Sequence, residues 1–175
     1  MKDTFDRCLA EVLRHEGKWA DHPRDPGGAT MQGITLRTYS KWLGRDATKD
    51  ELRNIPAAHR DTIYRTQYWD AVRAGDLPPG VDLAVFDMAV NSGPSRAART
   101  LQAALGVQVD GKIGPQTIQA AKVVHPSGLI SDYCKSRLAF LRSLDGWTTF
   151  AGGWKARVED VGSVATKMAT EPSIP

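Results

Sequence analysis

The sequence predicts a mainly α-helical, lysozyme-sized domain with a long structured loop or small hairpin after the first helix. Apolar residues recur at three- and four-residue spacing along most of the chain, whereas alternating strand patterns are few. Glycine and proline gather between the helical segments, most densely over residues 23–33. The 175 residues, 41% hydrophobic and 25% charged, are enough to bury a core without disulfides.

The first helix is expected over residues 3–15, where the apolar side chains repeat at helical spacing. Asp3 or Thr4 can cap its first turn. Glu16 then lies in the last turn or just beyond it, where Gly17 can stop the helix. Spacing alone favours the interpretation of this carboxylate as a solvated charge at a helix end.

Further helices are expected along the rest of the chain. Thr35 can cap a helix within residues 34–43, and Thr48 with Glu51 forms a capping box for a short one. Residues 81–90 are almost wholly apolar, which marks them as the central buried helix. The remaining helical segments are residues 56–69, 94–105, 115–124, 128–144 and 150–168.

Composition excludes several classes of protein. The net charge is +3 and the basic residues are scattered, which argues against a nucleic-acid-binding tail but suits an anionic surface such as a bacterial cell wall. No apolar stretch is long enough to span a membrane, and residues 1–13 carry acidic residues that a signal peptide would not have. Cys8 and Cys134 are expected to be buried thiols, with one disulfide as the alternative.

Candidate catalytic groups lie close together in the sequence just after the first helix. Glu16 is followed by Asp21, His22 and Asp25. Cleavage of a glycosidic bond needs a carboxylic acid for the leaving oxygen and, in inverting enzymes, a second group that activates water. The spacing matches neither a calcium loop nor a zinc site, and no phosphate- or dinucleotide-binding motif occurs, so no metal or cofactor is predicted.

Four ordered motifs carry a family resemblance. The stretch HEGKWADHPRDPGGATMQGIT at residues 15–35 resembles the signature of the glycoside hydrolase family 108 lysozymes, the N-acetylmuramidase endolysins of phages and their bacterial relatives. YRTQYW at 64–69 and DMAVNSG at 87–93 are similar to two further motifs of that family. DGKIGPQT at 110–117 resembles a turn in its predicted peptidoglycan-binding region. Lys18 and Trp19 depart from the family's usual Gly-Tyr, which bears on substrate contact.

The resemblance implies a division of the chain and an acid catalyst. Residues 1–95 would form the lysozyme-like catalytic region and 96–170 a helical peptidoglycan-binding region packed into the same globular domain, with 171–175 as a flexible tail. Glu16 would be the general acid, in apolar surroundings that keep it protonated. Asp25 or Thr30 would hold the nucleophilic water, although Asp25 can instead stabilise its own turn.

Aromatic and amide side chains are the candidates for substrate contact. Aromatic faces suit the apolar faces of sugar rings, but aromatics at helical spacing also form cores. Asn91 could bind an N-acetyl group or simply cap its helix, and Asp87 is expected to anchor a buried hydrogen bond. The predicted substrate-binding residues are Trp19, Tyr64, Tyr68, Trp69 and Asn91.

The expected function is hydrolysis of the β-1,4 bond between N-acetylmuramic acid and N-acetylglucosamine, with inversion. The alternatives are a lytic transglycosylase and a non-catalytic peptidoglycan-binding or secretion-accessory protein. A monomer is expected, with peptidoglycan glycan strands as its partner and no membrane insertion. Without a signal peptide, the protein is expected in the host cytoplasm until holin-type release or another export route delivers it to the periplasm and cell wall.

Overall fold

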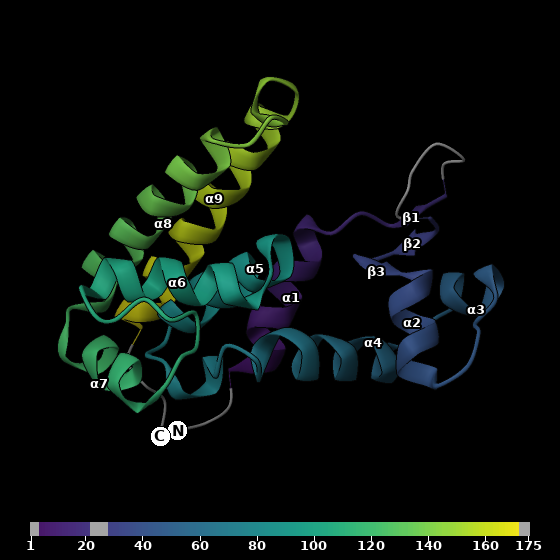
Figure 1. Cartoon of the computed structure of the whole chain (residues 1–175), viewed down its shortest axis with the longest axis horizontal. Helices are drawn as coiled ribbons and strands as arrows, with labels where there is room; N and C mark the ends of the chain where they lie inside the picture. The colour runs from purple at the N-terminus through teal and green to yellow at the C-terminus, as the bar shows by residue number, and fades with distance from the viewer. Residues whose placement is uncertain (1–3, 22–27, 172–175) are drawn as a thin grey trace.

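The computed structural model describes residues 4–21 and 28–171, which form a mainly α-helical molecule with one small sheet (Figure 1). The predicted fold class is confirmed. In chain order the elements are α1 (Phe5–His15), β1 (Trp19–Ala20), β2 (Thr30–Met31), β3 (Ile34–Thr35), α2 (Leu36–Leu43), α3 (Lys49–Arg53), α4 (Ala57–Tyr64), η1 (Arg65–Trp69), η2 (Ala74–Asp76), α5 (Val81–Ser92), α6 (Pro94–Leu105), α7 (Pro115–Val123), α8 (Pro126–Arg142) and α9 (Trp147–Thr170).

Helix α5 is the centre of the larger part of the molecule. Every residue from Val81 to Ala89 is buried, as its apolar sequence predicts, and α5 packs against α1, α6, α8 and α9. The helix ends at Gly93, whose positive φ of 86° turns the chain, and Pro94 then opens α6 at the position where its missing N–H costs nothing. We call α1 together with α5 to α9 the large lobe.

Helices α8 and α9 form a long antiparallel hairpin that projects from the large lobe (Figure 1). They make the most extensive helix-to-helix contact in the structure. Both begin earlier than predicted: α8 at Pro126 and α9 at Trp147. Gly128, Gly152 and Gly153 lie inside these helices.

Three short antiparallel strands in the order β1-β2-β3, with α2 and α3, form a small lobe at the other end of the molecule (Figure 1). The helix caps here were correctly predicted. Thr35 Oγ1 accepts a hydrogen bond from the Thr38 N–H at the start of α2, and Thr48 and Glu51 make a complete capping box for α3. The predicted loop or hairpin after α1 is therefore this small sheet.

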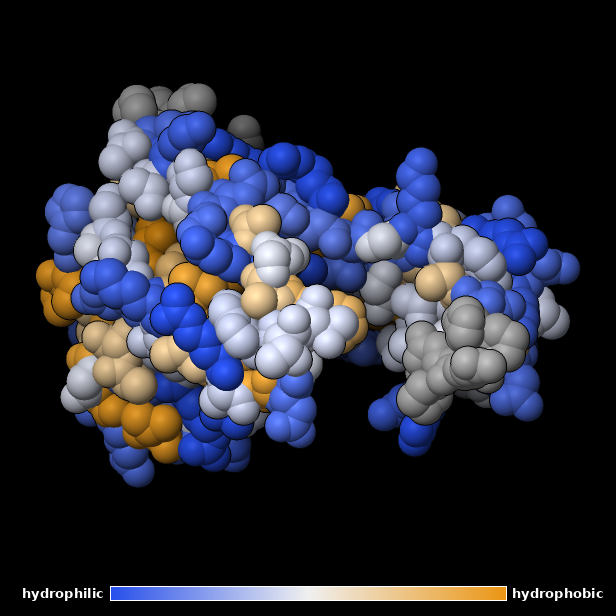
Figure 2. Space-filling model, turned by 90° about the horizontal axis from the view of Figure 1, so that it is seen from above, coloured by the Kyte–Doolittle hydropathy of each residue, from blue (hydrophilic) through white to orange (hydrophobic). Residues whose placement is uncertain are grey.

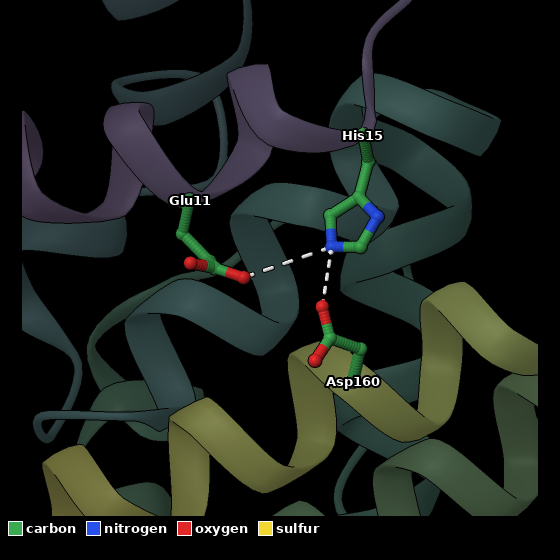
Figure 3. A group of neighbouring side chains, drawn as sticks. All are labelled: Glu11, His15 and Asp160. Carbon is green, nitrogen blue, oxygen red and sulfur yellow. Dashed lines mark ion pairs between the residues drawn. The ribbon is translucent and has the colours of Figure 1, made fainter.

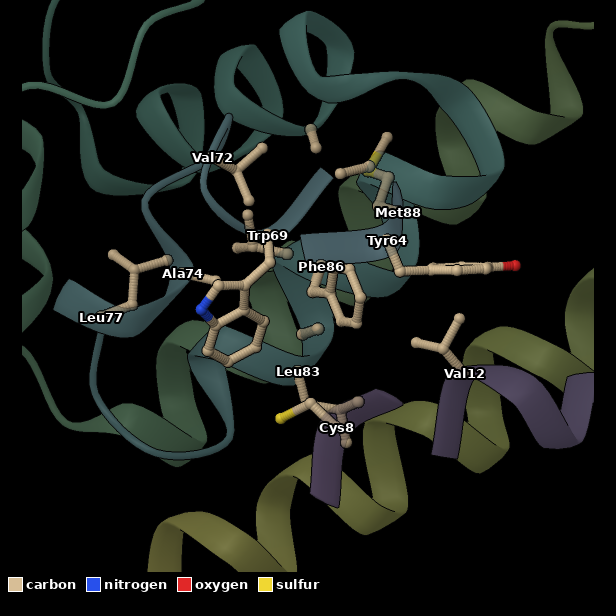
Figure 4. Close-up of a cluster of buried hydrophobic side chains, with 14 of the residues drawn as sticks. Cys8, Val12, Tyr64, Trp69, Val72, Ala74, Leu77, Leu83, Phe86 and Met88 are labelled. Carbon is tan, nitrogen blue, oxygen red and sulfur yellow. The ribbon is translucent and has the colours of Figure 1, made fainter. Parts of the chain in front are cut away.

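Helix α4 leads from the small lobe back to the large lobe and passes into the π-helical turn η1 at Arg65. The sequence predicted one regular helix over residues 56–69, but the wider turn changes which side chains share a face. Trp69 lies in the core, where its ring meets Phe86 edge-on at a centroid distance of 5.2 Å (Figure 4). Its ring also meets Phe5 edge-on, at 5.4 Å.

The turn over residues 110–115 is held from α6. Gln102 donates to Asp110 Oδ1 at 2.7 Å and accepts from the Gly111 N–H at 2.8 Å, and Gly111 has a φ of 82°. Pro115 then begins α7. The predicted structural role of this turn is confirmed, with Gln102 as the side chain that fixes it.

The surface is hollowed between the two lobes (Figure 2). Two segments cross this junction: the chain that leaves α1 for β1, and α4 on its way back. Among the described helices, none combines the length and apolar character that crossing a membrane requires. Cys8 is a buried thiol as predicted, whereas Cys134 is only partly buried, and the two are not joined in a disulfide.

Candidate active site

Glu16 lies at the junction of the two lobes, directly after the last residue of α1. Its backbone is extended, with φ −84° and ψ 133°, so the helix ends at His15 and the chain turns towards β1. The upstream residues Phe5, Cys8 and Val12 bury the inner face of α1 and thereby fix where its end lies. The Glu16 side chain is 14% exposed, which leaves its carboxyl group accessible at the edge of the core.

A guanidinium from the C-terminal helix holds one oxygen of Glu16. Arg157 Nη2 on α9 donates to Glu16 Oε1 at 2.8 Å and to Asp87 Oδ1 at 2.7 Å, and its Nε lies 3.1 and 3.2 Å from the two Asp87 oxygens. Arg157 is 13% exposed. Burial works against its charge, but Asp87 and then Glu16 outweigh burial and raise the pKa of Arg157 above its ordinary value.

Asp87 anchors this network from the middle of α5. Its side chain is completely buried, and Arg137 on α8 also donates to it, Nη1 to Oδ2, at 2.6 Å. Burial opposes ionisation of Asp87, but Arg137 and then Arg157 overcome that effect and hold its pKa below the usual range. The prediction that Asp87 anchors a buried hydrogen bond is confirmed, and its partners are two arginines.

Gly33 lies against the other oxygen of Glu16. It has a φ of 76°, and a Cβ atom placed on it would lie 2.7 Å from Glu16 Oε2 and 2.6 Å from Tyr64 Oη. The Tyr64 hydroxyl donates to the Gln32 carbonyl at 2.7 Å, which fixes the strand turn next to Glu16. The sequence analysis did not single out Gly33 as a site residue, although this glycine begins the Gly-Ile-Thr run of the family motif.

Two tyrosines line the α4–η1 side of Glu16. Tyr64 is 1% exposed and has its hydroxyl directed out of the core (Figure 4), while Tyr68 is half-buried with its ring 5.7 Å from that of Tyr64. Burial, and then the negative charge of Glu16, raises the pKa of both hydroxyls, so both stay protonated donors. The structure therefore brings together Glu16, Tyr64 and Tyr68 from the predicted set.

The small lobe carries Trp19 and Thr30. Trp19 is partly buried on β1 with the Arg53 guanidinium 4.4 Å from its ring centroid. Thr30 pairs with Ala20 and Thr35 in the sheet, and its hydroxyl donates to the Gly28 carbonyl at 3.3 Å. The other candidate for holding water, Asp25, lies outside the described residues, as does His22.

Two further predicted substrate-binding residues, Trp69 and Asn91, lie in the core and on the surface, respectively. Trp69 is 1% exposed and packed within the core, so it has no surface with which to contact a glycan, and we remove it from the substrate-binding set. Asn91 is exposed near the end of α5 and accepts a hydrogen bond from Ser92 Oγ at 3.2 Å. It is not the cap of that helix, since Gly93 takes this position.

A second group of charged side chains joins α1 to α9 one turn away from Arg157 (Figure 3). His15 Nε2 lies 3.6 Å from Glu11 Oε1 and 3.2 Å from Asp160 Oδ2, and these three residues are close enough to share a metal ion. However, Arg14 Nη1 already donates to both Glu11 oxygens at 2.8 Å. We therefore interpret the group as an ion-pair cluster that fixes α1 against α9.

Comparison with known proteins gives the family. Residues 9–93 match Glycosyl hydrolase 108, and residues 96–159 match a predicted peptidoglycan domain. The solved structure of Brucella abortus SagA is 41% identical, with a TM-score of 0.89 over 99% of this chain and 100% of that one. This chain belongs to the glycosyl hydrolase 108 family. A search of curated proteins gives no match.

Membership of the glycosyl hydrolase 108 family confirms the resemblance inferred from the four sequence motifs. It identifies the chain as a glycoside hydrolase, and the adjoining peptidoglycan domain indicates peptidoglycan as its substrate. Glu16, Gly33 and Asp87 lie in the hydrolase match, whereas Arg137 and Arg157 lie in the peptidoglycan-domain match. The ion pairs around Glu16 thus cross from one matched segment to the other.

Proposed function

We propose that this glycosyl hydrolase 108 chain is an N-acetylmuramidase that hydrolyses the β-1,4 bond between N-acetylmuramic acid and N-acetylglucosamine, with Glu16 as general acid. The observation that carries this proposal is the position of Glu16. It is a largely buried carboxyl directly after α1, with one oxygen held by Arg157 and the other beside Gly33 and Tyr64. Fixed geometry of this kind is what a proton donor needs.

The two carboxyl oxygens of Glu16 have different surroundings, which supports distinct roles. Oε1 accepts from Arg157, so it cannot also carry the transferred proton in that geometry. In the proposed role as general acid, Glu16 therefore carries the proton on Oε2, beside Gly33, and passes it to the glycosidic oxygen as the bond breaks. The protonated hydroxyls of Tyr64 and Tyr68 line the same side and are available as donors to substrate or water.

Inversion requires a second group that activates water on the opposite face of the sugar. Asp25 and Thr30 remain the proposed candidates, and both come from the segment that joins β1 to β2 or from β2 itself. Asp25→Asn and Thr30→Ala, assayed side by side, separate them. The variant that loses activity by about a hundredfold or more identifies the group that holds the water.

Digestion of purified peptidoglycan by wild type and Glu16→Gln tests the proposal. We expect wild type to release fragments with reducing muramic-acid ends and an added water, and Glu16→Gln to lose at least about a thousandfold in rate. Glu11→Gln, five residues earlier on α1 and hydrogen-bonded to Arg14, is the matched control and should keep its activity. Anomer-resolved NMR of the first product should show the α-anomer if the reaction inverts.

Three outcomes would contradict parts of this proposal. Anhydro-muramic ends without water uptake would identify a lytic transglycosylase. Binding to peptidoglycan without any cleavage would identify a non-catalytic protein of the same fold. An active Glu16→Gln variant would assign the acid to another residue.

A further inference from the structure

The peptidoglycan domain of this chain does more than bind, because its last helix contacts the catalytic centre. We propose that Arg157 on α9 is a positioning residue for the general acid: it holds Glu16 in place and stabilises the carboxylate that forms when the proton leaves. This inference rests on the proposed role of Glu16. It assigns part of the catalytic machinery to the segment that matches a binding domain, residues 96–159.

The geometry makes Arg157 a rigid bridge between two carboxylates. Its Nη2 is 2.8 Å from Glu16 Oε1 and 2.7 Å from Asp87 Oδ1, while Nε is also directed at Asp87. The flat guanidinium offers several N–H groups in fixed directions, so it can bond both acids at once. A lysine would bring the same charge but only one nitrogen, and would not hold both partners in this arrangement.

Asp87 keeps the bridge from moving. It is fully buried on the central helix, and Arg137 holds it from the opposite side at 2.6 Å. The side chains of Asp87 and Arg137 are 0% and 2% exposed, whereas those of Arg157 and Glu16 are 13% and 14% exposed, so the network runs from the core to the accessible Glu16 carboxyl group. The central helix therefore sets the position of Arg157, and Arg157 sets the position of Glu16.

The charges in this network favour loss of the proton during the reaction. With Glu16 protonated, two guanidinium groups, Arg137 and Arg157, face one carboxylate, Asp87. When Glu16 gives up its proton, two carboxylates face two guanidinium groups and the network is balanced. Fixed charges that match the transition state better than the ground state lower the barrier.

Helix α9 makes a second contact with α1 one turn after Arg157. Asp160 Oδ2 lies 3.2 Å from His15 Nε2 (Figure 3). Arg14 Nη2 lies 3.6 Å from the same oxygen. Among the described residues, Arg157 on α9 pairs with Glu16, His15 on α1 precedes it, and the charge of Glu16 acts on Tyr64 of α4 and Tyr68 of η1. Asp87 on α5 and Arg137 on α8 extend the network, and Arg60 on α4 acts on Tyr64.

Arg157→Lys and Arg157→Ala test the proposal, with Glu16→Gln measured alongside and Arg14→Ala as matched control. Arg14 also joins α1 to α9, but its partners are Glu11 and Asp160. On soluble glycan strands we expect both Arg157 variants to lose about 10- to 100-fold in kcat. Their KM and their binding to insoluble peptidoglycan should stay within about threefold of wild type, and Arg14→Ala should match wild type in each of these measurements.

The split between kcat and KM separates positioning from a merely structural role. Arg157→Lys keeps the charge but loses the guanidinium that bonds Glu16 and Asp87 together, so kcat should fall while KM and the unfolding temperature stay near those of wild type. Far-UV circular dichroism and thermal unfolding establish whether each variant is folded. If Arg157→Ala is not folded, the test rests on Arg157→Lys.

Each result bears on one inference. Full kcat in folded Arg157→Lys and Arg157→Ala, with an inactive Glu16→Gln, overturns the role of Arg157 and leaves the proposed function intact. Loss of peptidoglycan binding with unchanged kcat overturns it as well, because Arg157 would then be a binding residue. An active Glu16→Gln overturns the proposed function itself.

Discussion

Gly33 and Glu16 are in such close contact that any side chain at position 33 would collide with the Glu16 carboxyl group. A Cβ at Gly33 would lie 2.7 Å from Glu16 Oε2, and the backbone there has a φ of 76° that non-glycine residues rarely adopt. In the turn between β2 and β3, only backbone atoms therefore lie against Glu16 Oε2, the oxygen that we propose carries the proton. This explains why a glycine is needed in the Gly-Ile-Thr run.

Gly33→Ala should therefore reduce activity more than it reduces stability. The substitution forces Glu16 or Tyr64 to move, so we expect at least about a tenfold loss of kcat, with about 1–2 kcal/mol lost from the free energy of unfolding. Gly28→Ala is the matched control, because Gly28 also has a positive φ, of 68°, but a Cβ there would meet nothing within 4 Å. Equal losses of kcat in the two variants would show that backbone strain, and not contact with Glu16, is responsible.

Local signals in the sequence were enough to predict most of the helices. The apolar run of α5, the capping box at Thr48 and the Gly93-Pro94 junction each act within a few residues, so they can be recognised without knowing the fold. The sheet was predicted only as a loop or hairpin, because strands of two residues are too short for an alternating pattern to develop.

Tyr64→Phe should loosen the same turn without changing its shape. It removes the 2.7 Å hydrogen bond from the Tyr64 hydroxyl to the Gln32 carbonyl, so this carbonyl loses its tyrosine donor. We expect a loss of about 1–2 kcal/mol in the free energy of unfolding and a several-fold loss of kcat. Tyr39→Phe is the control, since Tyr39 on α2 is similarly buried but its hydroxyl bonds His59 Nδ1 on α4 at 2.9 Å. A kcat loss as large in Tyr39→Phe would argue against a specific effect at Glu16.

Trp69→Leu should weaken the fold and leave substrate affinity unchanged. The indole is 1% exposed and packs edge-on against Phe5 and Phe86, so its loss leaves a cavity worth about 2–4 kcal/mol of stability. KM, measured well below the unfolding temperature, should equal that of wild type. Trp19→Leu provides the contrast, because Trp19 is partly buried on β1 and remains a proposed substrate contact. A raised KM in Trp69→Leu would return Trp69 to the substrate-binding set.

The partners of Glu16 were beyond the reach of sequence reasoning. Arg157 is 141 positions away from Glu16 and 70 from Asp87, and nothing in its local sequence distinguishes it from the other arginines. Asp87 could be recognised as unusual because an acid in the middle of an apolar helix must find a partner, but the pattern does not say which one. The turn at η1 also had no signal, so the different environments of Tyr68 and Trp69 could not be separated.

Asp87→Asn should lower stability at neutral pH and remove part of its dependence on pH. The variant leaves Arg137 and Arg157 facing a neutral amide, which we expect to cost about 3–5 kcal/mol of the free energy of unfolding at pH 7. The folded pKa of Asp87 is lower than the unfolded value of about 3.9, despite its burial, because the two arginines favour the ionised form. Its stabilising contribution is therefore complete above about pH 4 and is lost as the pH falls through the folded pKa.

The difference in unfolding free energy between wild type and Asp87→Asn should accordingly narrow below about pH 4 in denaturant titrations. Asp82→Asn is the control, because burial raises the pKa of that carboxyl despite its hydrogen bonds from Thr4, Leu83 and Gly80. The pH dependence of its contribution therefore has the opposite sign. The unfolding free energy of wild type should increase relative to that of Asp82→Asn as the pH falls. A difference between wild type and Asp87→Asn that stays constant down to about pH 2 would mean that Asp87 does not depend on its charge to hold the two arginines.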